Sequence, residues 1–275
     1  MSSAEDRDDG SSRRALAALE AARPVWTGRH WAIGIALLVF YAVCWQLANV
    51  DLAKLATGLP KLGYWIASAW PPALAEMPIF LHRTAETIAM AALGTTGAVV
   101  LALPMAVLAA RNITPWPRLV GPVRVVLNAL RGIDSFVFAL LFVAAVGLGP
   151  FAGVLGIMLH TWGSAAKNFA DHIENINLEP YEAVRSTGAG RFSAIAYAVL
   201  PDVLPVTLSM ALFWWEFNVR ASTVLGVVGA GGIGQELKAS MDLLDFPRLF
   251  TIIALIVVVV TLIDKFSGWL RRRLI

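Results

Sequence analysis

EPYEAVRSTGAGR, residues 179–191, is a polar, charged segment in a chain that is otherwise mostly apolar. Asn177 can cap a helix at the start of this segment, and the carboxylates of Glu179 and Glu182 lie at the positive end of that helix. Gly188 then supplies a stop. The segment therefore predicts a helix of about two turns, too short and too charged to cross a bilayer. Between two membrane spans, such a helix lies on a membrane face, where a partner protein can reach it.

The composition of the whole chain is typical of a membrane protein. Hydrophobic residues make up 58% of the 275 residues, and charged residues make up only 15%. We therefore expect an all-α, polytopic membrane protein. The single cysteine, Cys44, excludes a disulfide within the chain, and there is no Lys/Arg-rich block with interleaved aromatic residues. Nucleic acid is accordingly not an expected partner.

Long apolar runs predict six transmembrane helices after a polar N-terminal tail. The tail, residues 1–29, is expected to be disordered and cytoplasmic, and residues 30–275 are expected to form one transmembrane domain. Residues 51–82 predict an interfacial loop with short helices. The predicted spans are about residues 31–47, 84–109, 121–146, 151–169, 200–217 and 249–269, and the short charged helix is expected at about residues 178–188.

The distribution of positive charge predicts the orientation of these spans. Fifteen of the 22 lysines and arginines lie in the tail, in the loop after the second span, in the segment around Glu182 or at the C-terminus. Six spans place all four of these regions on one side of the membrane. The positive-inside rule assigns that side to the cytoplasm, so both termini and the charged helix are predicted to be cytoplasmic.

A glycine-rich segment, GAGGIG at residues 229–234, matches the G-x-G-x-x-G pattern of dinucleotide-binding proteins. No strand precedes it and no βαβ unit is available, so this interpretation is rejected. One alternative is a flexible loop. The other is a helix breaker that opens a helix at residues 235–241 with an anion-binding end, in which Gly229, Gly231 and Gly232 have a re-entrant or gating role.

No nucleotide-binding motif that would support ATP hydrolysis occurs in the chain. The pattern G-x-x-x-x-G-K-[ST] is absent, and no Gly-Lys pair exists anywhere in the sequence. We therefore expect a chain that does not act as an ATP-hydrolysing enzyme and holds no cofactor of its own. If transport depends on ATP, the nucleotide site belongs to another polypeptide.

Several ionisable residues fall within the predicted spans, where their cost indicates either a structural or a functional role. Arg131 and Asp134 are three residues apart and are expected to share one helical face, and Glu216 and Arg220 are four residues apart. Each of these two pairs of residues is either a structural ion pair or part of a positively lined pathway for an anionic solute. His160, in the fourth span, favours a hydrogen bond between helices, and no cluster with metal-ligand spacing is present.

The charged helix also resembles a known motif. The spacing Glu182-Ala183-x-x-x-x-Gly188, with Leu200-Pro201 downstream, resembles the cytoplasmic EAA loop of ABC-importer permeases, although Val184 replaces the second alanine of that motif. Residues 135–150 and 218–234 resemble phosphonate ABC-transporter permeases. In that family the loop is a coupling helix that docks on the ATPase. The residues that this resemblance assigns to coupling are Tyr181, Glu182, Ala183, Arg185, Gly188 and Arg191.

The resemblance implies a type I ABC-importer permease in the inner membrane of a bacterium. Its implied partners are a second copy of the chain, two cytoplasmic ATPases that bind ATP and Mg²⁺, and an extracytoplasmic solute-binding protein. The implied cargo is a phosphonate or a related phosphorus oxyanion, such as phosphite or phosphate. Two alternatives stay open: the same machine with another cargo, such as methionine, or a secondary transporter, which would need an ionic relay and usually an internal repeat.

Overall fold

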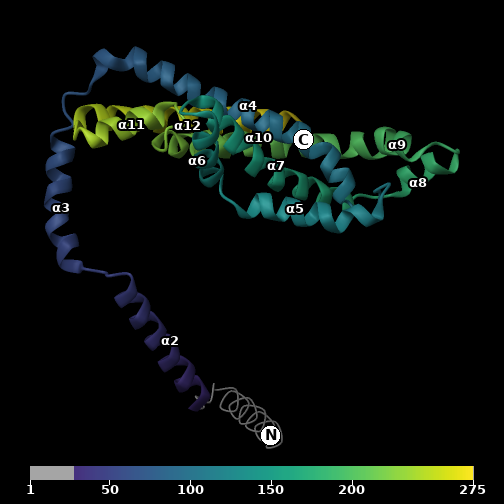
Figure 1. The fold of residues 1–275 in the computed structure, drawn as a ribbon, viewed down its shortest axis with the longest axis horizontal. Coiled ribbons are helices and arrows are strands. Elements are labelled where there is room, and N and C mark those ends of the chain that lie inside the picture. The colour runs from purple at the N-terminus through teal and green to yellow at the C-terminus, as the bar shows by residue number, and fades with distance from the viewer. Residues whose placement is uncertain (1–27, 275) are drawn as a thin grey trace, which may run out of the picture. The chain divides into compact units, whose positions relative to one another are not determined.

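The computed structural model describes residues 28–274, so residues 1–27 of the predicted tail lie outside the described residues. Within residues 28–274 every regular element is helical (Figure 1). Short non-α segments occur at Leu74–Glu76, Pro117–Leu119 and Ile195–Val199. The α-helices are α2 (Gly28–Leu47), α3 (Leu52–Ala67), α4 (Met77–Ala109), α5 (Val120–Gly132), α6 (Ser135–Val146), α7 (Pro150–Glu174), α8 (Glu179–Ser186), α9 (Arg191–Ala194), α10 (Leu200–Val227), α11 (Ile233–Asp242) and α12 (Phe246–Leu274).

The chain forms two compact units, Met1–Leu62 and Gly63–Ile275. In the first unit, α2 contains the predicted span 31–47. Residues 51–82, which are predicted to form an interfacial loop with short helices, contain the 16-residue helix α3, the short segment Leu74–Glu76 and the start of α4. Asp51 caps this helix, because its Oδ1 accepts hydrogen bonds from the amides of Ala53 at 2.9 Å and Lys54 at 3.1 Å.

The second unit contains long helices that include the predicted spans 84–109, 200–217 and 249–269. Three stretches of the described chain are long and apolar enough to cross a membrane, namely Leu74–Ala109, Arg191–Val227 and Phe246–Arg273. Two bent helix pairs, α2 with α3 and α5 with α6, raise this number to at most five. The predicted span 151–169 lies within α7, which does not meet the same criterion.

Helix α7 is less apolar because it is surrounded by protein. Most of its buried positions are small or hydroxylated residues, which allow neighbouring helices to approach closely. A Cβ added at Gly156 would lie 2.8 Å from the backbone nitrogen of Ala139 in α6, and one added at Gly163 would lie 2.6 Å from the Cβ of Leu130 in α5. Packing against α4, α5, α6 and α10 therefore replaces the lipid contact that would require large apolar side chains.

The predicted span 121–146 is not one continuous helix, because it consists of two helices joined by a bend. α5 and α6 meet at Ile133–Asp134 and are bent by 87°. Asp134 is the N-cap of α6, and its Oδ1 accepts a 2.8 Å hydrogen bond from the amide of Phe136. A new cap inside an apolar run begins a new helix, so residues before and after Asp134 do not share one helical face.

A π-helix at Ile195–Val199 joins α9 to α10, so Arg191–Val227 forms one long stretch. Pro201 and Pro205 follow directly, and neither can donate the backbone hydrogen bond of a regular α-helix. Wider π-type bonding is a common response where the i→i−4 ladder is interrupted. The two prolines therefore explain the π segment at the entrance to α10.

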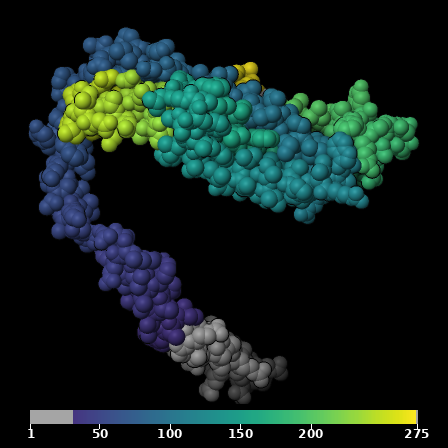
Figure 2. Space-filling model, viewed as in Figure 1, coloured from purple at the N-terminus to yellow at the C-terminus, as the bar shows by residue number. Residues whose placement is uncertain are grey.

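The largest core cluster of the second unit lies where α4, α5, α7 and the π-helix meet. Its buried side chains include Leu127, Phe169, Ile173 and Val199. α8 and α9 lie beside this cluster at one end of the unit, and α11 lies at the opposite end (Figures 1 and 2). The two ends therefore have separate environments, one around the charged helix and the other around the glycine-rich segment.

Candidate functional site

The predicted coupling helix is present as α8, Glu179–Ser186. Asn177 acts at its start, because its Oδ1 accepts a 3.0 Å hydrogen bond from the amide of Glu179. Gly188 ends the segment with φ +87°, in the left-handed region. A Cβ on Gly188 would meet no atom within 4 Å, so the backbone conformation alone, and not crowding, requires glycine here.

α8 is attached by one side and leaves its other side free. Tyr181 packs partly buried against the core cluster of α4, α7 and the π-helix. Glu182, Ala183 and Arg185 are exposed, although the guanidinium of Arg185 donates a 2.9 Å hydrogen bond to the carbonyl of Ala189. The exposed side can therefore bind a partner while Tyr181 holds the helix in place.

The loop between α4 and α5 supports the segment after α8. The Nη1 of Arg191 donates to the carbonyl oxygen of Pro115 at 3.2 Å. The ring centroids of Trp116 and Phe192 are 6.3 Å apart in an edge-on arrangement. Arg191, which the resemblance assigned to coupling, is thus also a structural contact between two loops that are 76 residues apart in sequence.

A second connection at this end is centred on Glu174, the last residue of α7, which lies outside the predicted span 151–169. Its Oε1 accepts hydrogen bonds from the amide of Arg111 and from the Nη2 of Arg124, both at 2.7 Å. Burial opposes the charge of Glu174, but the hydrogen bonds from Arg111 and Arg124 outweigh burial and lower the pKa of this carboxyl below its usual value. Glu174 and Arg124 are 50 residues apart, so their pairing depends on the fold and is not indicated by the sequence.

Arg131 and Asp134 do not form the predicted pair. Arg131 ends α5 and Asp134 caps α6, with the 87° bend between them. No ion pair of either residue occurs within residues 31–273. The expected hydrogen bond of His160 between helices is confirmed, since its Nδ1 lies 2.8 Å from the carbonyl oxygen of Ile133. His160 thus holds the α5–α6 bend against α7.

Glu216 and Arg220 do form the predicted pair, as part of a larger cluster of four charges. The Nη2 of Arg220 lies 2.6 Å from Oε1 of Glu216 and 3.4 Å from Oδ1 of Asp264. The other oxygen of Glu216 accepts from the Nη2 of Arg271 at 2.7 Å. We call Glu216, Arg220, Asp264 and Arg271 the α10–α12 charge cluster. Its formal charges cancel, and sequence spacing alone did not indicate its α12 members.

The glycine-rich segment is buried, so the prediction of a flexible loop is wrong. Gly231 and Gly232 are both buried and have φ values of +79° and +71°. The carbonyl of Gly229 accepts a 3.0 Å hydrogen bond from the amide of Gly149. A Cβ on Gly232 would lie 2.5 Å from Oγ1 of Thr87 in α4. These glycines serve close packing, while their gating role stays a prediction.

The N-terminal end of α11, which begins at Ile233, already has a carboxylate of the chain beside it. The amide of Gly232 donates to Oε2 of Glu86 at 3.3 Å, and the amide of Ile233 donates to Oγ1 of Thr87 at 2.9 Å. Glu86 is itself paired with Arg83 at 3.0 Å. The predicted anion-binding end is therefore occupied by an internal acidic side chain.

Ion pairs extend from Glu86 across this end of the second unit. Arg83 also binds Glu236 of α11 at 3.2 Å, and Glu236 binds Arg248 of α12 at 2.6 Å. Arg248 further contacts Glu76 at 3.3 Å. These ion pairs connect α4, α11 and α12, and they hold α11 in the unit.

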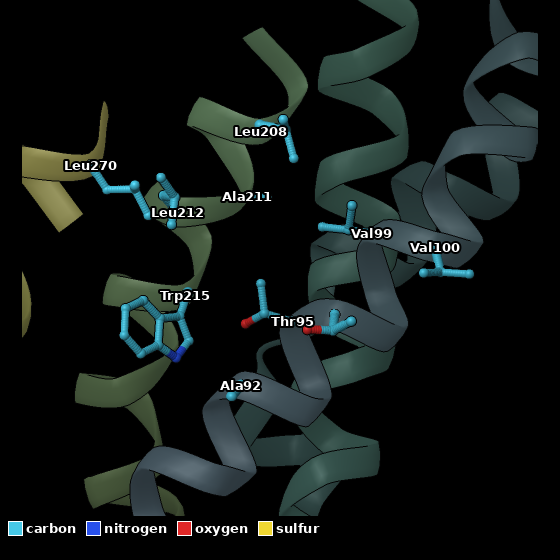
Figure 3. A pocket seen from close by; sticks show the side chains of 10 residues that line it. Ala92, Thr95, Val99, Val100, Leu208, Ala211, Leu212, Trp215 and Leu270 are labelled. Atoms are coloured by element: carbon cyan, nitrogen blue, oxygen red, sulfur yellow. The ribbon is translucent and has the colours of Figure 1, made fainter. Parts of the chain in front are cut away.

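A buried polar contact joins three helices in the middle of the unit. The side-chain Nδ2 of Asn218 donates to Oγ1 of Thr95 at 2.8 Å and to Oγ1 of Thr161 at 3.0 Å, and these residues belong to α10, α4 and α7. Thr95 also lines a cavity of about 460 Å³ between α4, α10 and α12 (Figure 3). Most of the lining is aliphatic, and the buried Nε1 of Trp215 has no hydrogen-bond partner there. This lining does not suit a free oxyanion.

Comparison with known proteins decides the family. The family model described as "Binding-protein-dependent transport system inner membrane component" matches residues 102–275, which is more than half of the chain. The chain belongs to this family of transport permeases. It is therefore a membrane-spanning transport component rather than an enzyme, and the family places it among inner membrane proteins of bacterial importers.

Three relatives carry names that describe phosphorus oxyanion transport. The putative phosphite transport system permease protein HtxC of Stutzerimonas stutzeri is 45% identical over 88% of this chain and 86% of its own. The phosphite transport system permease protein PtxC of the same species is 40% identical over 90% of each chain. The phosphate-import permease protein PhnE of Mycolicibacterium smegmatis is 40% identical over 82% of this chain and 42% of its own.

A solved structure confirms the fold. An inward-facing chain of the MetNI methionine ABC transporter aligns with a TM-score of 0.64 at 22% identity, over 73% of this chain and 98% of that chain. At this identity the likeness concerns the fold and not the cargo. The predicted all-α, type I ABC-importer permease fold is confirmed by this match together with the family.

Proposed function

We propose that the chain is the permease subunit of an ATP-driven importer that moves a phosphorus oxyanion, such as phosphite, phosphate or a phosphonate, across the cytoplasmic membrane. One observation carries this proposal: two relatives named as phosphite permeases are 45% and 40% identical over at least 86% of their length. Because these alignments extend over nearly the whole chain, they are not limited to one part of the permease.

Energy enters the permease through α8. In the proposed complex, a separate cytoplasmic ATPase binds ATP and Mg²⁺ and holds the exposed side of α8, which carries Glu182, Ala183 and Arg185. Tyr181 packs against the core and holds α8 in place. Glu174 connects the end of α7 to the α4–α5 loop by a hydrogen bond. Movement of the ATPase would therefore shift α7 and α10 together, and rock the unit between inward-open and outward-open states.

The proposed complex contains two permease chains, two ATPases and one extracytoplasmic solute-binding protein. Both ends of the chain are proposed to be cytoplasmic, on the basis of the positive-inside distribution. The permease chains are proposed to be two copies of this sequence. The α10–α12 charge cluster supports assembly with a second permease chain. Its half-exposed charges lie within spans, where they need protein or water beside them instead of lipid.

Uptake by the reconstituted complex tests this function. The permease, its cognate ATPase and its binding protein are placed in lipid vesicles, and uptake of labelled phosphite, phosphate, methylphosphonate and methionine is compared with and without ATP. We expect ATP-dependent uptake of at least one phosphorus compound and no uptake of methionine. Uptake of methionine alone would change the cargo, whereas uptake driven by an ion gradient without the ATPase would support a secondary transporter.

A further inference from the structure

Three members of the α10–α12 charge cluster, Glu216, Arg220 and Asp264, lie inside two membrane-spanning helices, whereas Arg271 lies in the last turn of α12. Arg220 lies seven residues, roughly 10 Å, before α10 ends at Val227. Asp264 lies 18 residues, roughly 27 Å, after α12 begins at Phe246, and ten residues, roughly 15 Å, before Leu274. Both helices belong to stretches that are long and apolar enough to cross a membrane.

Two members of this cluster are half-exposed on the surface of the single chain. The side chains of Arg220 and Asp264 are 50% and 41% exposed, whereas that of Glu216 is only 13% exposed. Arg220 is held toward the middle of its span, because it binds Glu216 one turn earlier in α10 instead of extending to the outer interface. Charges in this position cannot face hydrocarbon without a large cost, so water or another polar surface must lie beside them.

The guanidinium of Arg220 retains unused hydrogen-bonding capacity on the exposed side. Its Nη2 makes both ion pairs, while Nε and Nη1 have no hydrogen-bond partner within residues 31–273. The contact with Asp264, at 3.4 Å, is longer than the one with Glu216, at 2.6 Å. An arriving anion can therefore replace Asp264 while Glu216 continues to hold Arg220 in place.

The same side of α10 is lined by aromatic rings. Phe213 and Phe217 precede Arg220 at helical spacing and are 49% and 44% exposed. Trp214 contacts both rings edge-on, with centroid distances of 5.9 Å. An anion that passes along these rings therefore meets the guanidinium of Arg220, which can bind it with two parallel hydrogen bonds.

We propose that Arg220, with Asp264 as its displaceable partner, forms a transit site for the oxyanion in a water-filled passage along the Phe213–Phe217 side of α10. This inference rests on the proposed function and names the residues that perform it. Glu216 and Asp264 together balance the charges of Arg220 and Arg271, so the empty site is electrically neutral. Asp264 then repels the bound anion and favours its release, so the site binds the oxyanion only briefly.

Cysteine labelling tests whether water reaches the side of α12 that carries Asp264. In a Cys44→Ala background, Asp264→Cys is compared with Leu262→Cys, which is 60% exposed and lies two residues away, on another side of α12. The complete complex in vesicles is treated with an anionic methanethiosulfonate on both faces. We expect Asp264→Cys to react at least ten times faster than Leu262→Cys, and phosphite to slow the reaction. Equal rates, or no effect of phosphite on a complex that transports phosphite, would overturn the transit site.

Uptake measurements test the cation itself. We expect Arg220→Gln to lower phosphite uptake at least tenfold, while stimulation of the ATPase by loaded binding protein continues. Arg272→Gln, at an exposed position in the last turn of α12, is the matched control and should keep uptake within twofold. Asp264→Asn should slow release and lower the apparent KM. Normal uptake by an intact Arg220→Gln complex would refute the transit site, whereas the absence of all oxyanion uptake by the wild type would refute the proposed function instead.

Discussion

At the scale of single residues, Gly188 and Gly190, which follow α8, allow the effect of backbone conformation to be separated from the effect of crowding. Both lack any neighbour within 4 Å of an added Cβ, but φ is +87° at Gly188 and −61° at Gly190. Valine at position 188 must adopt a left-handed conformation that costs about 1–3 kcal/mol, whereas valine at position 190 need not. We expect Gly188→Val to abolish ATPase stimulation by loaded binding protein, and Gly190→Val to preserve it.

The two variants also separate coupling from insertion. Membrane insertion of the Gly188→Val permease should be normal, because the change lies in a surface segment outside the spans. Co-purification of the ATPase, measured with each variant, reports whether α8 still docks. An intact Gly188→Val complex with full stimulation would contradict the coupling role of this segment.

Glu174 links the protonation of one side chain to the stability of the coupling end. Its pKa is lowered in the folded chain, so its stabilising contribution is present above the ordinary carboxyl pKa of about 4.3 and is lost as the pH falls through the lowered value. We expect Glu174→Gln to lower the melting temperature of the purified permease at pH 7, with a cost of roughly 1–2 kcal/mol for the charged hydrogen bonds. The difference from wild type should shrink toward pH 3. A difference that does not depend on pH would show that charge is not the cause.

At the scale of elements, the sequence predicted the helices well and their interruptions poorly. Apolar runs located α4, α7, α10 and α12, because burial in lipid or in the bundle selects apolar residues along their whole length. The break at Asp134 was missed. Its capping signal was present, but a charge inside an apolar run was interpreted as half of an ion pair. A local hydrogen bond to the amide of Phe136 satisfies that carboxylate instead.

In the candidate site, features that depend on neighbouring residues could be predicted, whereas contacts between residues far apart in the sequence could not. α8 and its stop at Gly188 depend on neighbouring residues, and both could be predicted from the sequence. The contacts of Glu216 with Arg271 and of Glu236 with Arg83 could not, because these arginines lie 55 and 153 positions away. Ion pairs of this kind become visible only when the topology brings the helices together.

The segment around Gly232 permits a test of packing against gating. An added methyl group would meet Oγ1 of Thr87 at 2.5 Å and strain a φ of +71°, so we expect Gly232→Ala to lower the melting temperature by several degrees. Gly268→Ala, with no atom within 4 Å, is the matched control and should leave it unchanged. If Gly232→Ala slows uptake without any loss of thermal stability, movement of this segment is the better explanation.

At the scale of the whole molecule, the machinery is concentrated in the second unit. The four core clusters, the coupling helix and the charge clusters around Glu86, Glu174 and Glu216 all lie within Gly63–Ile275. The aligned MetNI chain is matched over 98% of its length by only 73% of this chain, so the fold can be completed without a counterpart for the remainder. The boundary between Leu62 and Gly63 is therefore the place to test how much of the chain the permease core requires.

This division predicts that a chain beginning at Gly63 inserts, binds its ATPase and retains ATPase stimulation by loaded binding protein. Its remaining positively charged segments keep the orientation, because the loop after α4, the coupling segment and the C-terminus all carry arginines. Co-purification of the ATPase and vesicle uptake check the result. A chain beginning at Val120 is the control. It lacks α4, which supplies the Thr95 contact to Asn218 and the Glu86 contact to Gly232, so it should fail to assemble. Loss of assembly in the longer chain as well would show that the first unit is required for the permease core to form.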